Sequence, residues 1–513
     1  MTPHPLLPPR VSDPTAVGTP GKHPRFLSEA DCHDIARRLA RYTQYREPCM
    51  VLIHSSWTGN VRWARNLVST SGEVRRNFVD YIGCGQDWKN NESWEGRVTT
   101  NCITDAALVA LVRQNERINK VDGTKFYPHL DLITHVPLEP LPAVLPQLFS
   151  EATYQLDAGH RDATATQLAR TAADAGMLSA GYISVSANSL AFLTSWGVSQ
   201  YYAYTWAQYS VTVRDPKGIG SGWAGVDWHD WDKIDGARLT GIALDKCLKS
   251  RNPVAVEPGR YTTILEPQAV CELVKPLMKA LDRYNAEHDW QQPMHSANHE
   301  ASVNENKLIC YDDSLEPYSK IGERVVDERI TISADPLDPE LGFPSFNEDG
   351  TLEGEIIYRP VTWIERGVLQ ALSYKRSIAA RCLDRSTGLG SDGAFRMSFS
   401  GVPTSMEEMV ATTERGLLVT RFVGVVELER RSTLCSGCTR DGVWLIEKGK
   451  ISKAVKNFRF VESILFALNN IEQLGVPQRA FTPPPKIFSH IQQFHNPWSC
   501  RRSRSKTSAL PHS

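Results

Sequence analysis

Two cysteines three positions apart, Cys435 and Cys438, form the clearest metal-type motif in this sequence. A structural zinc site would need a second cysteine pair at a suitable spacing, and the sequence has none. A redox pair is expected beside a β-α-β unit, whereas this pair precedes a hairpin pattern. We therefore interpret the two residues as thiols in a turn.

Two further clusters contain oxygen and imidazole ligands. Residues 227–232 carry three aspartates and His229, but their spacing does not fit a calcium loop and two tryptophans intervene, so we interpret them as a solvated loop. His295 and His299 are four positions apart, as in a zinc-binding helix. The glutamate follows the second histidine instead of the first, and Pro293 precedes the pair, which favours a loop.

Residues 388–393 read GLGSDG and match the dinucleotide-binding pattern G-x-G-x-x-G. Those glycines bind pyrophosphate only between a strand and the beginning of a helix. Residues 395–399 alternate like a strand, so we interpret this segment as a loop.

Composition excludes several classes of protein. The 513 residues include 57 Lys and Arg against 58 Asp and Glu, which excludes a generally basic nucleic-acid binder and an acidic disordered chain. No apolar run reaches the ~18 residues of a membrane-spanning helix, so we expect no membrane association. The eleven cysteines are an odd number, and seven prolines precede Arg25 without an apolar segment. We expect no signal peptide or disulfide framework, and a cytoplasmic location.

Apolar periodicity predicts the elements of the first half. Ser28 is a candidate helix cap, and short strands at 50–53 and 60–64 are separated by a turn at Gly59. Further helices are expected at 104–118, 151–175 and 236–249, and further strands at 181–188 and 203–213.

The second half is rich in strand patterns. Strands are expected at 261–265, 325–332, 355–363 and 417–426, with a hairpin at 443–446 and 451–455 and a helix at 461–474 that ends at Gly475. We predict an α+β protein with four parts: a disordered Pro-rich tail at 1–25, an N-terminal α/β domain at 26–250, a strand-rich C-terminal domain at 251–485, and a basic disordered tail at 486–513.

Several blocks of sequence, in consistent order, resemble the TldD/PmbA family, also called the modulator-of-DNA-gyrase family. They include PVAVEPGRYTTILEPQAVCEL at 253–273, RPVTWIERGVL at 359–369, SMEEMVATTERGLLVTRF at 405–422 and the stretch 438–475. N-terminal blocks at 63–72 and 210–225 agree as well. The likeness covers about residues 26–485.

The resemblance implies a cytoplasmic metallopeptidase family that works as two-subunit assemblies. Its TldD-type subunit binds zinc through His-Glu-x-x-x-His at the start of a helix, together with a cysteine from the C-terminal domain. The PmbA-type subunit, also called TldE, lacks this motif. The family is associated with unfolded and leader peptides, which a cavity in the C-terminal domain would admit.

Residue-by-residue transfer places residues 266–271 at the zinc motif. Glu266 and Cys271 stand where the two histidines belong, and Pro267 stands where the glutamate belongs. Pro267 cannot activate a zinc-bound water, but it fits the first turn of a helix. Cys438 falls close to the cysteine ligand of the family.

Two hypotheses follow from this substitution. In the first, the chain is a zinc-free subunit that pairs with a TldD-like partner carrying His-Glu-x-x-x-His. In the second, Glu266, Cys271 and Cys438 form an altered metal site, because carboxylate and thiolate are both competent ligands. We favour the first, because an altered site would still lack a general base. A third class, a non-enzymatic gyrase or DNA modulator, finds no support in the near-neutral composition, and we do not expect nucleic-acid binding.

Overall fold

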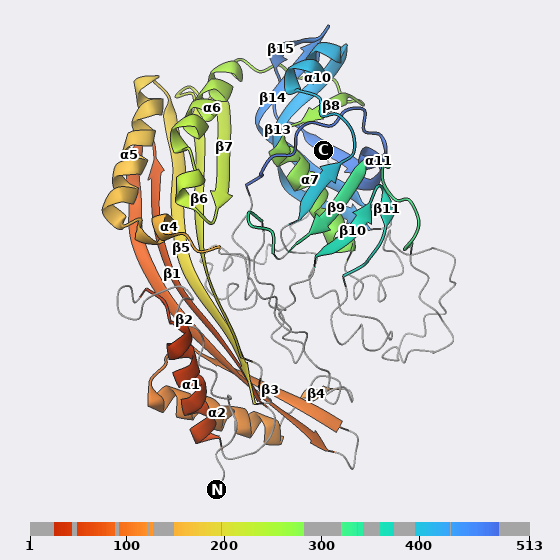
Figure 1. Ribbon diagram of the computed structural model, residues 1–513. Helices are drawn as coiled ribbons and strands as arrows, with labels where there is room; N and C mark the ends of the chain where they lie inside the picture. The colour runs from red at the N-terminus through yellow and green to blue at the C-terminus, as the bar shows by residue number, and fades with distance from the viewer. Residues whose placement is uncertain are drawn as a thin grey trace, which may run out of the picture.

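The computed structural model describes residues 25–43, 49–87, 92–121, 124–126, 148–195, 197, 199–281, 320–335, 337–341, 360–373, 395–430 and 432–481. Within them it is a mixed α+β structure with three sheets (Figure 1). The predictions for residues 1–24, 295–300, 388–393 and 486–513 lie outside the described residues.

The first sheet has seven strands in the order β4-β3-β2-β1-β5-β6-β7. All of its neighbouring pairs are antiparallel. Its strands are β1 (Cys49–Ala64), β2 (Leu67–Asp87), β3 (Glu92–Thr100), β4 (Thr124–Phe126), β5 (Leu178–Thr194), β6 (Ser199–Arg214) and β7 (Ser221–Trp228). The α+β prediction is therefore confirmed, but the description of this half as α/β is wrong, because α/β domains are built on parallel strands.

Helices cover one face of this long sheet at both ends (Figure 1). At one end, α1 (Glu29–Tyr42) and α2 (Asp105–Val121) pack on Val51 and Ile53 of β1. At the other end, α5 (Ala158–Asp174) and α6 (Gly236–Lys249) pack around Trp57 and Trp63 of the same strand. Odd-numbered residues of β1 share one face, so a single strand contributes to both cores. Short α4 (Glu151–Gln155) and the 3₁₀ turn η1 (Trp231–Lys233) lie beside α5 and β7.

The second half contains the other two sheets. One has the order β15-β14-β13-β8, with β16 also paired to β14, and the other has the order β11-β10-β9-β12. Their strands are β8 (Thr262–Leu265), β9 (Ile330–Ala334), β10 (Val361–Glu365), β11 (Val368–Leu369), β12 (Arg396–Phe399), β13 (Arg415–Glu429), β14 (Leu434–Glu447), β15 (Lys450–Ala454) and β16 (Arg459–Ser463). Strand β8 runs parallel to β13.

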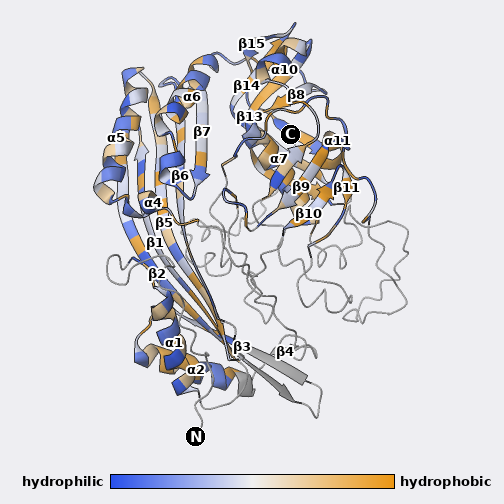
Figure 2. Cartoon of the chain, in the orientation of Figure 1, coloured by the Kyte–Doolittle hydropathy of each residue, from blue (hydrophilic) through white to orange (hydrophobic). Residues whose placement is uncertain are grey.

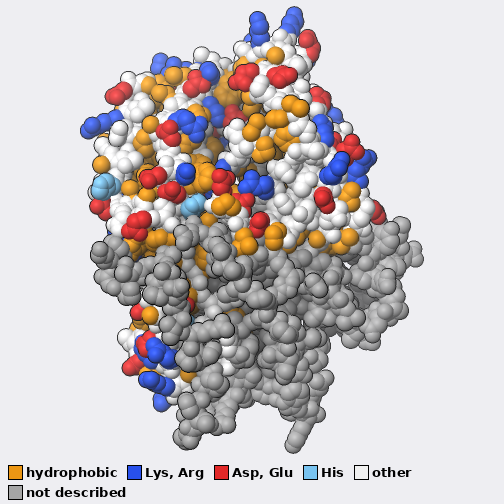
Figure 3. Space-filling view, viewed as in Figure 1, with side chains coloured by type: hydrophobic (Ala, Val, Ile, Leu, Met, Phe, Trp, Pro, Cys, Tyr) orange, Lys and Arg blue, Asp and Glu red, His pale blue; other side chains and the backbone are white. Residues whose placement is uncertain are grey.

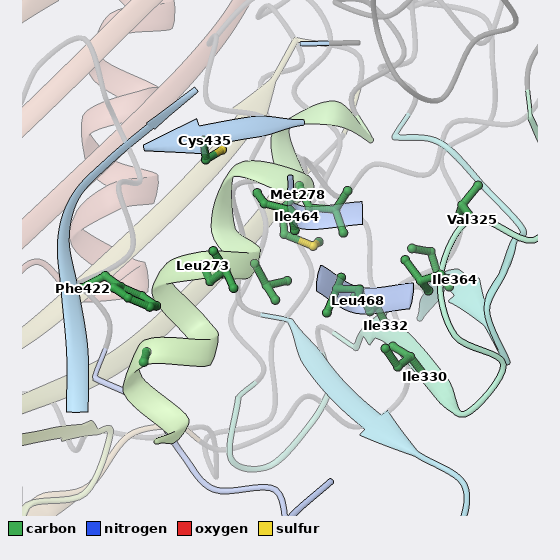
Figure 4. Packing of buried hydrophobic residues seen from close by; sticks show 14 of the residues in the cluster. Leu273, Met278, Val325, Ile330, Ile332, Ile364, Phe422, Cys435, Ile464 and Leu468 are labelled. Atoms are coloured by element: carbon green, nitrogen blue, oxygen red, sulfur yellow. The ribbon is translucent and has the colours of Figure 1, made fainter. Parts of the chain in front are cut away.

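Helix α7 (Pro267–Ala280) lies between these two sheets and supplies much of their shared core. Its Leu273 and Met278 pack with Ile332 of β9, Ile364 of β10 and Leu468 of α11 (Ile464–Asn469), as Figure 4 shows. A smaller core on the other face of the β13–β14 sheet contacts α10 (Met406–Thr412). Apolar stretches along β13, β14 and α7 follow this packing in Figure 2.

Several predicted elements have different limits in the structure. Strand β1 continues through Gly59, where a side chain would meet the Arg161 guanidinium at 2.5 Å, so the glycine makes room for that arginine and does not form a turn. The helix predicted at 151–175 is two helices, because Asp157 caps α5 by accepting from the His160 N–H. The helix predicted at 461–474 is strand β16 followed by α11, which begins after Ser463 and ends at Asn469.

Candidate functional site

The strand-to-helix junction that aligns with the zinc motif joins β8 to α7. Glu266 is the residue before the helix, and its N–H donates to the Val419 carbonyl of β13. Pro267 is the first helical residue, as predicted, and its missing N–H costs nothing there. The Glu266 carboxylate accepts from Lys246 Nζ of α6 at 2.6 Å, and the two side chains are 21% and 15% exposed. The carboxylate is therefore already neutralised by an ion pair.

One side of α7 is buried in the core, and the other side carries polar residues spaced three and four apart. Gln268 Nε2 donates to Glu272 Oε1 at 3.0 Å, and Glu272 Oε2 accepts from the Phe422 N–H of β13 at 2.6 Å. Burial raises the pKa of Glu272, although its hydrogen bonds from Gln268 and Phe422 oppose that change. The Phe422 N–H fixes the position of the Glu272 carboxylate. The hydrogen bond from Gln268 to this carboxylate therefore fixes the orientation of the Gln268 side chain.

Cys271 lies on the same side of α7 and is half-buried. Burial, with smaller contributions from the charges of Glu272 and Asp227, raises the pKa of its thiol to about 11. A zinc ligand must be the thiolate, so burial opposes the form of Cys271 that a metal ion would bind. Phe481 is hydrogen-bonded to Gln268 of α7 and lies edge-on to Trp223 of β7, so β7 lies close to this side of α7.

Cys438 lies in the middle of β14 and is exposed, while Cys435 in the same strand is buried. Side chains three positions apart in a strand point to opposite faces, so the two thiols cannot bind one metal ion. The prediction that this pair lies in a turn is wrong, because the residues belong to a strand paired on both sides with β13 and β16. Cys435 contributes to the same core as Leu273 (Figure 4).

The donor atoms at the motif position, as the structure places them, do not fit zinc. The Glu266 carboxylate is bound to an ammonium group, the Cys271 thiol is partly buried on α7, and Cys438 faces solvent on β14. Among the described residues, no group of three or more His, Cys, Asp and Glu side chains is close enough to hold a metal ion.

The end of β7 is contacted by a segment from far along the chain. Asp227 is buried, contrary to the solvated loop predicted for residues 227–232. The Arg479 guanidinium donates to the Asp227 carbonyl, lies 3.4 Å from its carboxylate, and lies 4.3 Å from the centroid of the Trp228 ring. Asp230 caps η1 by accepting from the Asp232 N–H at 3.2 Å. The Asp227 and Asp230 carboxylates are therefore engaged by other groups of the protein, whereas Asp232 is exposed.

Sequence reasoning missed five residues that bind across this junction: Lys246, Gln268, Glu272, Arg479 and Phe481. Gln268 and Glu272 had a local signal, because they are four positions apart in the helix that begins at Pro267. Lys246, Arg479 and Phe481 come from segments distant in sequence, and no spacing pattern connects them to α7.

Residues 258–493 match the family model of the PmbA/TldA metallopeptidase C-terminal domain. Residues 258–493 therefore carry a C-terminal domain of the PmbA/TldD metallopeptidase family. The resemblance found in the sequence is confirmed, and the domain includes β8, α7 and the strands packed on them. No curated protein sequence matches the chain.

Solved structures share the fold of both halves. A proposed modulator of DNA gyrase from Bacteroides thetaiotaomicron VPI-5482 is similar with a TM-score of 0.65 and 14% identity, covering 88% of this chain and 94% of that one. A second proposed gyrase modulator, from Thermotoga maritima MSB8, has a TM-score of 0.66 and 13% identity, covering 87% and 95%. TldE from Thermococcus kodakarensis has a TM-score of 0.66 and 16% identity, covering 86% and 92%.

Replacing Glu272 by glutamine should change how stability depends on pH. Because the folded-state pKa is raised, the contribution of Glu272 is fully present below its ordinary value of 4.5 and is lost as pH rises through the folded value. The stability of the parent protein relative to Glu272→Gln should therefore fall as the pH rises above 4.5. Urea unfolding at a series of pH values measures the difference. Glu257→Gln, an exposed glutamate, controls for the lost charge, and a difference that rises with pH would contradict the assignment.

Proposed function

We propose that this chain is the zinc-free partner subunit of a heteromeric metallopeptidase that acts on unfolded or leader peptides. The observation that carries the proposal is the junction at Glu266 and Pro267. Where catalytic relatives need two imidazoles and a carboxylate base, this chain has an ion-paired glutamate, a helix-starting proline and a cysteine. A proline has no group that could take a proton from water.

The partner in this proposal is a TldD-like protein that carries His-Glu-x-x-x-His. The similarity to a structure named TldE is consistent with that role. The seven cysteines whose side chains the structure describes are all free thiols, which supports a reducing, cytoplasmic setting. No helix in the described part of the chain is long and apolar enough to span a membrane. On the face shown in Figure 3, the basic and acidic side chains of the described residues are interspersed, without a basic patch for nucleic acid.

The decisive experiment compares the chain alone with the chain co-expressed with a TldD-like protein of the same organism. Elemental analysis should find substoichiometric zinc in the chain alone and about one zinc per partner subunit in the complex. Cleavage of unfolded casein should occur only with the complex and should stop with a chelator. Glutamine in place of the glutamate in the partner's His-Glu-x-x-x-His should abolish cleavage without separating the subunits.

Three outcomes would overturn the proposal. Stoichiometric metal in the chain alone, lost on Cys271→Ala, would establish the altered site of Glu266, Cys271 and Cys438. Chelator-sensitive cleavage by the chain alone would establish it as the enzyme. Duplex DNA binding that weakens steeply with salt, without any partner subunit, would support the gyrase or DNA modulator.

A further inference from the structure

The last described segment, residues 476–481, lies across the junction between β7 and α7. The Phe481 N–H donates to Gln268 Oε1 at 2.8 Å, and Gln268 Nε2 donates to the Phe481 carbonyl at 3.2 Å. One side-chain amide thus binds both main-chain groups of one residue, as a neighbouring β-strand does. Such contacts do not depend on the side chain of the bound residue, so they recognise an extended peptide backbone of any sequence.

The Phe481 side chain lies among aromatic rings of the first sheet. Its ring meets Trp223 of β7 edge-on at 5.9 Å and Tyr182 of β5 at 6.5 Å. Gly225 lies beneath it, and a Cβ there would come within 3.3 Å of the Phe481 ring. This arrangement favours an aromatic side chain, because edge-on ring contacts add to the gain from burying apolar surface.

Two positions earlier, Arg479 fills a second, anionic subsite. Its side chain is 11% exposed and lies against the Asp227 carboxylate, which is 1% exposed. It also donates to the Glu340 carbonyl at 2.7 Å and packs on the Trp228 ring. A buried carboxylate beside carbonyl oxygens and an aromatic face is suited to a guanidinium group.

The rest of the segment makes little contact. Val476, Pro477 and Gln478 are exposed, and Val476 is 61% exposed although it is apolar. The segment has no regular secondary structure, and Arg479 and Phe481 make its hydrogen bonds to the other described residues. It is therefore held in the manner of a bound peptide, through two side chains and one backbone position.

We infer that four residues form a binding site for extended peptides: Gln268, Asp227, Trp223 and Tyr182. The site recognises an arginine two positions before an aromatic residue, and residues 479–481 of the chain itself occupy it as an intramolecular ligand. The site lies along β7, the edge strand of the first sheet, and at the first turn of α7. A peptide here would pass beside the position of the zinc motif. Only the choice of peptides as ligands rests on the proposed function. The experiments below measure peptide binding and not metal content or cleavage, so the binding site and the subunit role can each fail without the other.

The full-length double variant Arg479→Ala/Phe481→Ala should open the site. A fluorescein-labelled peptide of residues 474–483 should bind this variant at least about tenfold more tightly than it binds the parent chain, by fluorescence anisotropy. Adding Gln268→Ala should remove about tenfold of that gain, whereas Gln473→Ala, an exposed glutamine, should leave it unchanged. Equal binding to the parent and the double variant, with an unchanged far-UV spectrum, would overturn the inference.

A second measurement uses the parent chain, so it does not depend on the variant's folding. An excess of unlabelled peptide should displace residues 479–481 and accelerate hydrogen exchange at the Phe481 amide. The same peptide with alanine at the positions of Arg479 and Phe481 should have no effect. Unchanged exchange of the Phe481 amide at peptide concentrations that saturate the parent chain in the anisotropy measurement would also overturn the inference.

Discussion

Replacing Gly222 of β7 by alanine should lower the free energy of unfolding by about 3 kcal/mol. An alanine Cβ would lie 2.1 Å from the Ala243 carbonyl oxygen and 2.6 Å from the Cys247 nitrogen, both backbone atoms of α6. Backbone atoms in a helix cannot rotate away, so α6 must shift as a unit. The shift would also move Lys246 away from Glu266. The Gly222→Ala substitution should therefore weaken both the packing of β7 on α6 and the ion pair between Lys246 and Glu266.

Urea unfolding followed by tryptophan fluorescence measures this change. The matched control is Gly241→Ala in the same helix, where an added Cβ meets no atom within 4 Å. That variant should gain up to about 1 kcal/mol, because alanine restricts the unfolded chain and favours the helix. If both variants lost the same stability, the close packing of β7 on α6 would not be the cause.

Reversing the charge of Lys246 with Lys246→Glu should cost about 3 kcal/mol, because it places two carboxylates together in a largely buried position. Lys246 lies in the last turn of α6, and Glu266 immediately precedes α7. Each charge therefore also suits the dipole of its own helix end. The exchange Lys246→Glu/Glu266→Lys should recover at least half of the loss, but not all of it, because both helix dipoles then oppose the pair.

The control for this experiment is Lys249→Glu, three residues along the same helix. Its ion pair with Asp245 is exposed, with side chains 66% and 57% accessible, so its reversal should cost less than about 1 kcal/mol. Thermal and urea unfolding of the parent, Lys246→Glu, Glu266→Lys and the double variant give the coupling energy directly. A double variant no more stable than Lys246→Glu alone would mean that the two side chains do not interact.

Local signals were sufficient for some elements. The helix expected at 236–249 has those limits, because its apolar positions Leu239, Ala243 and Cys247 follow one face and Asp235 caps it. The hairpin at Glu447 and Lys450 turns through Lys448 and Gly449, both with positive φ, as the glycine indicated. In these cases the information lies within a few residues of the element itself.

Where distant residues decide the structure, the sequence was misleading. Gly59 favours a turn by its type, but the packing of Arg161 from α5 makes it part of a strand of sixteen residues. The helix after β8 could be predicted from Pro267 and the apolar spacing behind it. The partners of that helix could not, because Lys246 and Phe481 reach it from before and after it along the chain.

The parallel pairing of β8 with β13 has a consequence during synthesis. The ribosome must add about 150 residues after β8 before β13 emerges, which takes roughly 10–30 seconds at typical rates. Throughout that interval the apolar residues of α7 that pack on β13 remain uncovered on that side, although β9 and β10 are synthesised earlier. We expect the nascent chain to depend on chaperones that shield such surfaces, and slower translation of residues 266–415 to increase aggregation.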